Sequence, residues 1–275
     1  KLKMDKQKLE LLKSEIDSYT GNNIVIAFSG GVDSSLILKL ACDSARLKGT
    51  TVYAVTIKSL FNSEEDVIIS KKTAAETGAE HIVIYADNFE ELGIGNNPPD
   101  RCYICKKNIF SKLIEKAEEL NAPVVLDGTN KEDLNLYRPG IRALKELGIL
   151  SPLADAGLTK KDVREMADYY NISTSTRPSV PCFATRFPYN TAITTADIKK
   201  VEEGENYLKS FGLYNIRLRI HGNIARIEVD EEYFSTIISN RAEIISKLKS
   251  LGYDYVVLDL EGFRSGSMDI SLRNQ

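Results

Sequence analysis

The regular alternation of short apolar strands with longer amphipathic segments limits the fold of this chain more than any other feature. Residues 24–28 (IVIAF) are apolar and largely β-branched, which is typical of a parallel strand buried on both faces. Residues 34–49 carry apolar side chains at helical spacing and end at a glycine, a common residue just after a helix. The same alternation predicts strands at 51–57, 81–86 and 122–129 and helices at 63–78, 101–120, 141–147 and 160–170. We therefore predict an α/β fold with a doubly wound parallel sheet.

A different pattern begins near residue 194 and predicts a second, smaller α+β domain. The order helix, strand, strand, helix, strand is predicted for residues 194–210, 215–220, 224–229, 231–250 and 254–259. The first two of these strands are expected to form a hairpin that turns at Gly222–Asn223. We therefore predict one domain over residues 1–178, opened by an amphipathic helix. A second domain over 179–275 would contain an active-site loop and the α+β fold.

The composition is that of an ordinary globular protein, with 43% hydrophobic and 27% charged residues. A net charge of −3 argues against a general polyanion binder, so we predict no nucleic-acid partner. The apolar runs are too short to span a bilayer, and the charged residues 1–16 lack the apolar stretch of a secretory signal. We therefore expect a cytoplasmic protein with no membrane partner. In such a reducing compartment, four cysteines indicate metal, cluster or redox chemistry more than a disulfide framework.

A glycine loop, FSGGVDSS (residues 28–35), joins the first predicted strand to the first predicted helix of the sheet. In a doubly wound fold, nucleotides bind where strands end at their carboxyl side. Two glycines allow a tight turn, and the amide groups of the helix N-terminus point at an anion. Ser29, Ser34 and Ser35 add hydroxyl donors. The loop lacks the lysine of a Walker A motif and does not fit GxGxxG, so the residues alone predict a phosphate site or, as the alternative, a serine-rich helix cap.

Three of the four cysteines stand in patterns that suggest metal chemistry. Cys102 and Cys105 form a CxxC pair in RCYICKK near the predicted start of a helix, and Cys182 follows a proline in SVPCFATRF. Two thiolates at CxxC spacing can reach one metal centre, and iron–sulfur clusters take thiolate ligands. Nearby positive charges would favour thiolates and offset the charge of a cluster. These are carried by Arg101, Lys106, Lys107 and Arg186.

Two alternatives to a cluster remain open for the CxxC pair, a redox dithiol and half of a zinc site. A structural zinc site needs four ligands. The two histidines, His81 and His221, stand in predicted strands or turns away from these segments, and we interpret each as a structural or a surface residue. Cys42 lies among apolar residues in a predicted helix and is interpreted as a core residue.

The sequence SGGVDSS resembles the SGGxDS motif of the PP-loop ATP pyrophosphatase superfamily. The resemblance implies that the loop holds the pyrophosphate group of ATP and that the enzyme adenylylates an oxygen of its substrate. It further implies that Asp33 helps to hold magnesium. The residues that it places around ATP are Ala27, Phe28, Ser29, Gly30, Gly31, Asp33, Ser34, Ser35, Ile57, Lys58, Gly128 and Asn130.

The resemblance extends to one branch of that superfamily, the LarE family of sulfur transferases. The resemblance spans about residues 8–270, nearly the whole chain, and the stretches that carry it are 128–140, 151–153, 177–190 and 258–269. The implied reaction adenylylates a carboxylate of pyridinium-3,5-biscarboxylic acid mononucleotide. Sulfur then replaces AMP to give a thiocarboxylate, and a second round completes a precursor of the nickel-pincer nucleotide cofactor.

The family uses two sulfur sources, and the cysteines distinguish them. In one branch, a cysteine matching Cys182 gives up its own sulfur. In the other, three cysteines matching Cys102, Cys105 and Cys182 hold a [4Fe-4S] cluster with an open iron that delivers sulfide. Because this chain has all three cysteines, the resemblance favours the cluster, with an outside source of sulfide. Sacrifice of Cys182 is the alternative.

Further site residues lie in the predicted second domain. Arg217 and Arg219 alternate along a strand and so share a face, which suits bidentate contacts to a phosphate. The resemblance assigns them to the phosphate of the mononucleotide, whereas solvated surface charges are the alternative. It also implies catalytic roles for four residues, Glu205, Cys182, Asp33 and Arg186. Glu228 and residues 264–267 are weaker candidates. Finally, it implies a homo-oligomer such as a hexamer.

Three other functions are compatible with a PP-loop and compete with this one. A tRNA thiolase also joins ATP to sulfur, although the negative net charge argues against it. An amide-forming ligase such as an NAD synthetase has no need of three cysteines. A nucleotide-binding module without activity would not need both an intact loop and intact cysteines.

Overall fold

The computed structural model describes residues 4–86, 89–134, 139–178, 180–264 and 266–269, which fold into two compact units. Of these residues, the first unit contains 4–59, 63–92 and 100–178. The second contains 60–62, 93–99 and 180–269 with the gap at 265. The short segments 60–62 and 93–99 were expected in the first domain. They join the second unit because backbone hydrogen bonds tie Phe61 to Phe183 and Gly95 to Ile193.

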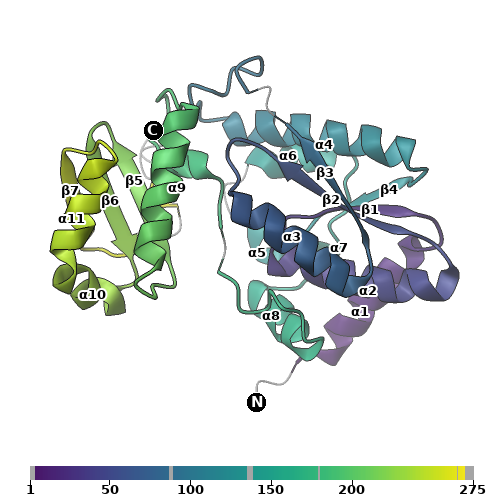
Figure 1. Ribbon diagram of the computed structural model, residues 1–275. Coiled ribbons are helices and arrows are strands. Elements are labelled where there is room, and N and C mark those ends of the chain that lie inside the picture. The colour runs from purple at the N-terminus through teal and green to yellow at the C-terminus, as the bar shows by residue number, and fades with distance from the viewer. Residues whose placement is uncertain (1–3, 87–88, 135–138, 179, 265, 270–275) are drawn as a thin grey trace. The chain divides into compact units, whose positions relative to one another are not determined.

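The first unit is built on a four-stranded parallel sheet with strand order β3-β2-β1-β4 (Figure 1). In register, Ile24 pairs with Val52 on one side and with Val124 on the other. The parallel sheet confirms the prediction from the alternating pattern. Strand β4 is shorter than expected because residues after Leu126 turn away to form a local network around Asp127. The strands are β1 (Ile24–Ala27), β2 (Val52–Lys58), β3 (Glu80–Tyr85) and β4 (Val124–Leu126).

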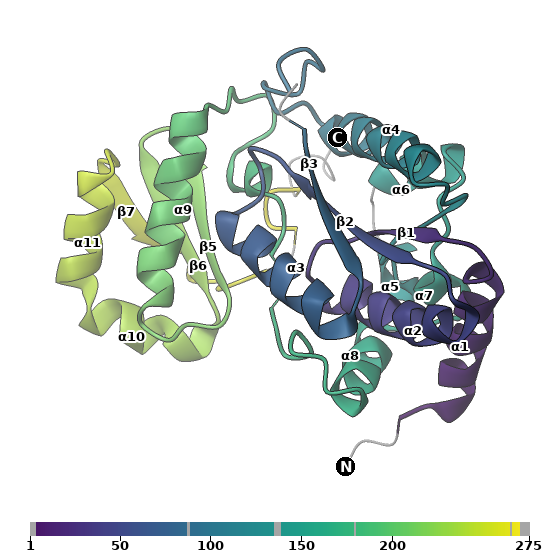
Figure 2. The same cartoon turned by 45° about the vertical axis from the view of Figure 1, so that its right-hand side comes forward.

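Helices cover both faces of this sheet, as Figure 2 shows. Alternate residues of β1 explain the two cores, because Ile24 and Ile26 enter one and Val25 enters the other. The first core includes side chains of α1 (Lys6–Tyr19), α2 (Val32–Lys48), α3 (Glu64–Thr77), α7 (Pro152–Asp155) and α8 (Lys160–Tyr169). The second includes side chains of α4 (Arg101–Glu119) and α6 (Pro139–Glu146). A short helix, α5 (Lys131–Leu134), follows β4.

Local sequence signals fix the ends of several helices. Ser63 and Thr159 each form a capping box with the acid three residues later, which satisfies amide groups at the helix start. Gly49 and Gly78 adopt the left-handed conformation that ends α2 and α3. The end of the first helix of the sheet at Gly49 was predicted from the sequence and is confirmed.

The second unit contains a three-stranded mixed sheet with order β5-β6-β7. The hairpin of β5 and β6 turns at Gly222–Asn223, as predicted, and β7 runs parallel to β6. The prediction of one helix over 231–250 was wrong. Asn240 interrupts it with non-helical dihedral angles of φ −101° and ψ 16°, so two separate helices form after a short 3₁₀ turn. The elements are η1 (Phe183–Arg186), α9 (Thr195–Lys209), β5 (Ile216–His221), β6 (Ile224–Val229), η2 (Glu231–Tyr233), α10 (Phe234–Ser239), α11 (Arg241–Ser250) and β7 (Tyr255–Leu258).

Among the residues that the structure describes, no helix is long and apolar enough to cross a membrane.

Candidate active site

The glycine loop connects β1 to α2 and requires glycine at its tightest point. Gly30 has a φ of +68°, in the left-handed region. A Cβ atom at Gly30 would lie 2.7 Å from Ser70 Oγ and 3.1 Å from the Ser70 amide nitrogen, so the loop packs directly on α3. Gly31 is the N-cap of α2 and offers no side-chain acceptor to the amide groups of the first turn. Those amide groups are therefore available to an anion at this helix end.

Three serine hydroxyls order this loop from within. Ser29 Oγ accepts from the Gly31 amide at 3.3 Å. Ser34 Oγ and Ser35 Oγ donate to the carbonyl oxygen of Gly31 at 3.2 and 2.8 Å. The turn is thus held in one shape by residues of the SGGVDSS motif itself.

The segment that follows β4 presses against the start of α2. A Cβ atom at Gly128 would lie 3.0 Å from the Ser34 amide nitrogen and 3.2 Å from Asp33 Cβ, so glycine is required for this close approach. Asn130 Nδ2 donates to Asp33 Oδ1 at 3.3 Å. Gly128, Asn130 and Asp33, which the sequence predicted as site residues from separate stretches, therefore lie together.

The other predicted nucleotide residues lie where β1 and β2 end. The Phe28 amide donates to the carbonyl oxygen of Val55 at 2.9 Å, and Thr56 Oγ1 donates to the carbonyl oxygen of Phe28 at 2.8 Å. Ile57 and Lys58 are the last residues of β2, and Ala27 is the last of β1. Since β1 and β4 are neighbours whose crossovers lead to opposite faces, this edge is the topological switch point of the sheet.

Two basic residues at this site were not found from the sequence. Lys160 forms an ion pair with Asp33 Oδ2. Arg177 donates to the carbonyl oxygen of Gly30 at 3.3 Å and to Asp66 Oδ1 at 2.6 Å. The residues that they contact in the glycine loop and α2 are far away in sequence, so neither pairing leaves a local pattern.

The CxxC pair lies at the start of α4 in the first unit. Cys102 is exposed and Cys105 is half-buried, and neither forms a disulfide bond. Their spacing of three places them on one face of the helix. Cys42 is buried in the core, as predicted, and burial raises the pKa of its thiol to about 11.

Cys182 belongs to the second unit, immediately before η1. Its carbonyl oxygen accepts from the amide and the hydroxyl of Thr185 at 3.0 and 2.8 Å, which fixes the backbone beside the thiol. Within the described residues, no group of three or more His, Cys, Asp or Glu side chains is placed to hold a metal ion. The three-cysteine cluster therefore stays a prediction.

Arg186 and Glu205 form the centre of a buried polar network in the second unit. Arg186 Nε and Nη2 donate to the two carboxylate oxygens of Glu205 at 2.8 and 3.0 Å. The Leu218 amide also donates to Glu205, at 2.9 Å. Burial acts to raise the pKa of Glu205, but the charge and hydrogen bonds of Arg186 outweigh it and hold this pKa below its usual value.

Arg217 and Arg219 are buried beside this pair, so the alternative of solvated surface charges is wrong. Arg219 Nε donates to Glu228 at 3.0 Å, and its Nη1 donates to the Thr185 carbonyl oxygen at 2.7 Å. The guanidinium of Arg217 lies 5.0 Å from the centre of the Phe263 ring, and burial lowers its pKa to about 10. Arg186 and Arg219 are thus paired with the buried residues Glu205 and Glu228, and the guanidinium of Arg217 lies in the same buried network.

The comparisons with known proteins agree with this geometry. The family model for asparagine synthase matches residues 20–94, which contain the glycine loop. A pyridinium-3,5-bisthiocarboxylic acid mononucleotide synthase of Lactiplantibacillus plantarum is 38% identical over 90% of this chain and 90% of its own. The chain belongs to the LarE family.

Two further relatives show how far the likeness extends. An uncharacterized protein of Methanocaldococcus jannaschii is 37% identical over 94% of this chain and 98% of its own length. A tRNA-specific 2-thiouridylase of Rickettsia bellii is 25% identical over 67% of this chain and 60% of its own. As a LarE family member with a PP-loop, the protein is an ATP-dependent sulfur transferase, which sets aside the amide-forming ligase and the inactive module.

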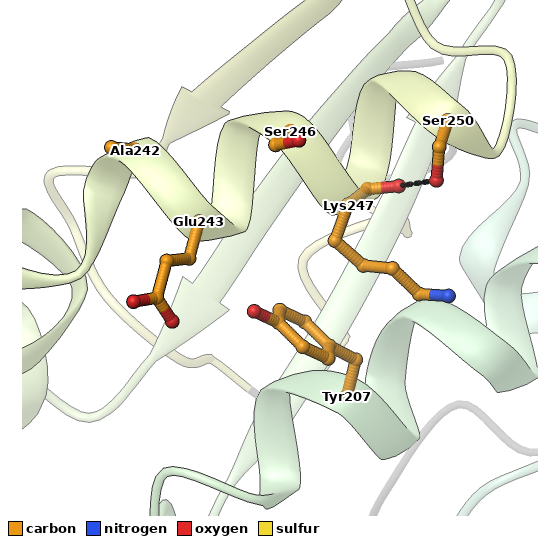
Figure 3. A pocket seen from close by; sticks show the side chains of 6 residues that line it. All are labelled: Tyr207, Ala242, Glu243, Ser246, Lys247 and Ser250. Atoms are coloured by element: carbon orange, nitrogen blue, oxygen red, sulfur yellow. Dashed lines mark hydrogen bonds between the residues drawn. The ribbon is translucent and has the colours of Figure 1, made fainter.

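A pocket of about 530 Å³ lies between α9 and α11 of the second unit (Figure 3). Lys247, on its wall, pairs with Glu203 at 2.5 Å. Its lining consists of Tyr207, Ala242, Glu243, Ser246, Lys247 and Ser250. None of the predicted site residues is among them, so we assign no step of LarE chemistry to this pocket.

Proposed function

We propose that this protein converts both carboxylates of pyridinium-3,5-biscarboxylic acid mononucleotide into thiocarboxylates, a step toward the nickel-pincer cofactor. The observation that carries the proposal is the likeness, over nine-tenths of both chains, to a synthase named for the bisthiocarboxylic product. The glycine loop at the switch point supports the ATP step, and three cysteines support the sulfur step.

In the first step, a carboxylate oxygen of the substrate attacks the α-phosphorus of ATP. The bond from that phosphorus to the bridging oxygen breaks, and the electron pair leaves with pyrophosphate. The amide groups at the start of α2 would hold the pyrophosphate, in the turn that the serine hydroxyls order. Ala27, Phe28, Ile57 and Lys58 would contact the nucleoside, together with Gly128 and Asn130.

Asp33 fits a role as a magnesium ligand, because its carboxylate lies in the first turn of α2, beside the expected phosphates. Magnesium is usually bound by one or two carboxylates and by the phosphates of the substrate. When bound, it would offset the negative charge of the leaving pyrophosphate.

In the second step, sulfur attacks the carbonyl carbon of the acyl adenylate, and the bond to AMP breaks. We propose that Cys102, Cys105 and Cys182 hold a [4Fe-4S] cluster, which when bound would supply the sulfide. The donor set fits, since none of the three cysteines forms a disulfide bond and two of them lie on one helix face near Arg101 and Lys106. Cys42, which is buried in the core, would take no part.

The buried arginines of the second unit would bind the phosphate of the mononucleotide. Arg217 and Arg219 are the proposed phosphate ligands. The Arg186–Glu205 pair would hold the strand that carries them, because Glu205 accepts from the Leu218 amide between them. The guanidinium groups of Arg217 and Arg219 suit bidentate contacts to a phosphate.

Iron and acid-labile sulfide measured on protein purified without oxygen test the cluster. We expect both in the wild type, and we expect Cys102→Ala and Cys182→Ala to lose them. Cys42→Ala is the matched control and should keep its iron. Iron-free wild-type protein that loses the elements of hydrogen sulfide from Cys182 during turnover, seen by mass spectrometry, would instead establish the sacrificial mechanism.

Pyrophosphate release tests the substrate. It should depend on the biscarboxylate mononucleotide, and Asp33→Ala should abolish it while keeping the iron. Release that requires tRNA in place of the mononucleotide would identify a tRNA thiolase and contradict the proposal.

A further inference from the structure

Lys160 contacts the side chain that the proposed reaction assigns to magnesium. Its ammonium group pairs with Asp33 Oδ2, while Asn130 occupies Oδ1 of the same carboxylate. The side chains of Lys160 and Asp33 keep 31% and 19% of their exposure, so the pair borders solvent. Solutes can therefore reach this ion pair.

The fold holds Lys160 in this position through several contacts. Thr159 and Asp162 form the capping box of α8, and Lys8 pairs with Asp162 at 2.7 Å. The Lys131 amide donates to the carbonyl oxygen of Leu158 at 2.9 Å, which joins the loop before α8 to the segment after β4. The segments that carry Lys160 and Asn130, the two residues that contact Asp33, are thus joined by a backbone hydrogen bond.

Helix stability does not explain a lysine at this position. Lys160 is the first residue of α8, at the positive end of the helix dipole, where a cation is unfavourable. Stabilisation of the Asp33 carboxylate does not explain the lysine either. A carboxylate in the first turn of α2 is already favoured by the dipole of that helix. We therefore infer that Lys160 binds a second anion, besides the Asp33 carboxylate, that is present during the reaction.

We propose that Lys160 is a ligand of the β- and γ-phosphates of ATP and stabilises the leaving pyrophosphate. This inference rests on the proposed function, in which the glycine loop holds that group. Without nucleotide, the ammonium group pairs with Asp33. When ATP binds, Asp33 would hold magnesium and Lys160 would contact the phosphates. The bond between the α-phosphorus and the bridging oxygen breaks, its electrons pass to pyrophosphate, and the ammonium group keeps its proton.

Binding of inorganic pyrophosphate, measured by calorimetry in EDTA, tests this role without magnesium and without turnover. Lys160→Met should weaken binding about tenfold or more, the usual effect of losing one charge-assisted hydrogen bond. Asp33→Asn should tighten binding, because it removes a repelling charge and releases Lys160. Lys161→Met is the matched control, since Lys161 is the next residue, is 67% exposed and pairs with Glu165. It should bind like the wild type.

The outcomes separate the two proposals. If the wild type binds pyrophosphate and Lys160→Met binds it equally well, the role of Lys160 is wrong and the proposed function stands. If the wild type does not bind pyrophosphate, the role of Lys160 is wrong, and the proposed function is decided separately by substrate-dependent release of pyrophosphate from ATP. Should Lys160→Met fail to fold, Asp33→Asn still decides, because unchanged or weaker binding by that variant contradicts the proposal.

Discussion

Arg186 and Glu205 form a bidentate ion pair in the interior of the second unit, with side-chain exposures of 0% and 6%. Arg186 also donates to the carbonyl oxygen of Pro181 at 2.9 Å, next to Cys182. The pair therefore connects α9 to the loop that carries the cysteine. It stabilises the fold only while both partners are present, because each alone would be a buried charge.

Arg186→Met is expected to lower the free energy of unfolding by about 3–5 kcal/mol, the usual cost of leaving one charge of a buried pair without its partner. Urea unfolding followed by circular dichroism measures this loss. The double variant Arg186→Met with Glu205→Leu should recover most of it, because no charge then remains uncompensated. A loss below about 1 kcal/mol in the single variant would show that water or another group replaces the arginine.

The same pair predicts how stability depends on pH. The pKa of Glu205 lies below its usual value of 4.5 in the folded protein, because Arg186 outweighs the effect of burial. The ionised carboxylate therefore contributes stability above pH 4.5, and this contribution is lost as the pH falls through the lowered pKa. Glu205→Gln cannot titrate. The difference in unfolding free energy between wild type and this variant should be constant above pH 4.5 and should shrink below it.

Much of the first unit could be predicted from the sequence, because its signals are local. The strand at residues 24–28 precedes the glycine loop directly, and Ser63 and Thr159 are followed three residues later by the acids that complete their caps. Such patterns act within one or two helical turns, so no tertiary contact is needed to interpret them.

The missed features depend on contacts between residues far apart in the chain. Lys160 is 127 residues from Asp33, and Arg177 is 147 residues from Gly30. Asn97, expected in the first domain, donates to the carbonyl oxygen of Phe187, 90 residues away. A single sequence carries no mark of such pairings, and a lysine at a helix start resembles any surface charge.

Thiol reactivity should separate the cysteines. Burial raises the pKa of Cys42 to about 11, so few of its thiols are ionised at pH 8, and access is blocked. Cys102 is exposed. In iron-free protein, iodoacetamide should modify Cys102 at least tenfold faster than Cys42, as read by mass spectrometry of peptides. Comparable rates would mean that the core around Cys42 opens readily.

Arg177→Met should impair ATP use without loss of iron. It removes the hydrogen bond to the Gly30 carbonyl oxygen and the ion pair with Asp66, so the loop is held less firmly. We expect the KM for ATP to rise about tenfold, because misplaced phosphate contacts weaken binding and orientation. In Arg177→Lys, the KM for ATP should rise less, because lysine keeps the positive charge beside the loop. A changed iron content with an unchanged KM would contradict this role.

Gly30→Ala and Gly31→Ala should differ although the two glycines are adjacent. At Gly30, an alanine must adopt a φ near +68°, which costs about 1–2 kcal/mol, and its Cβ meets Ser70 at 2.7 Å. At Gly31 the backbone is extended, with φ −82°, and the nearest atom to a Cβ is Ser29 Oγ at 3.3 Å. Gly30→Ala should therefore lower the melting temperature more and lose most pyrophosphate release. Replacing Ser70 by alanine as well should restore only part of the stability, because the Ser70 backbone nitrogen stays 3.1 Å from the added Cβ. Equal behaviour of the two alanine variants would show that the left-handed turn at Gly30 is not required.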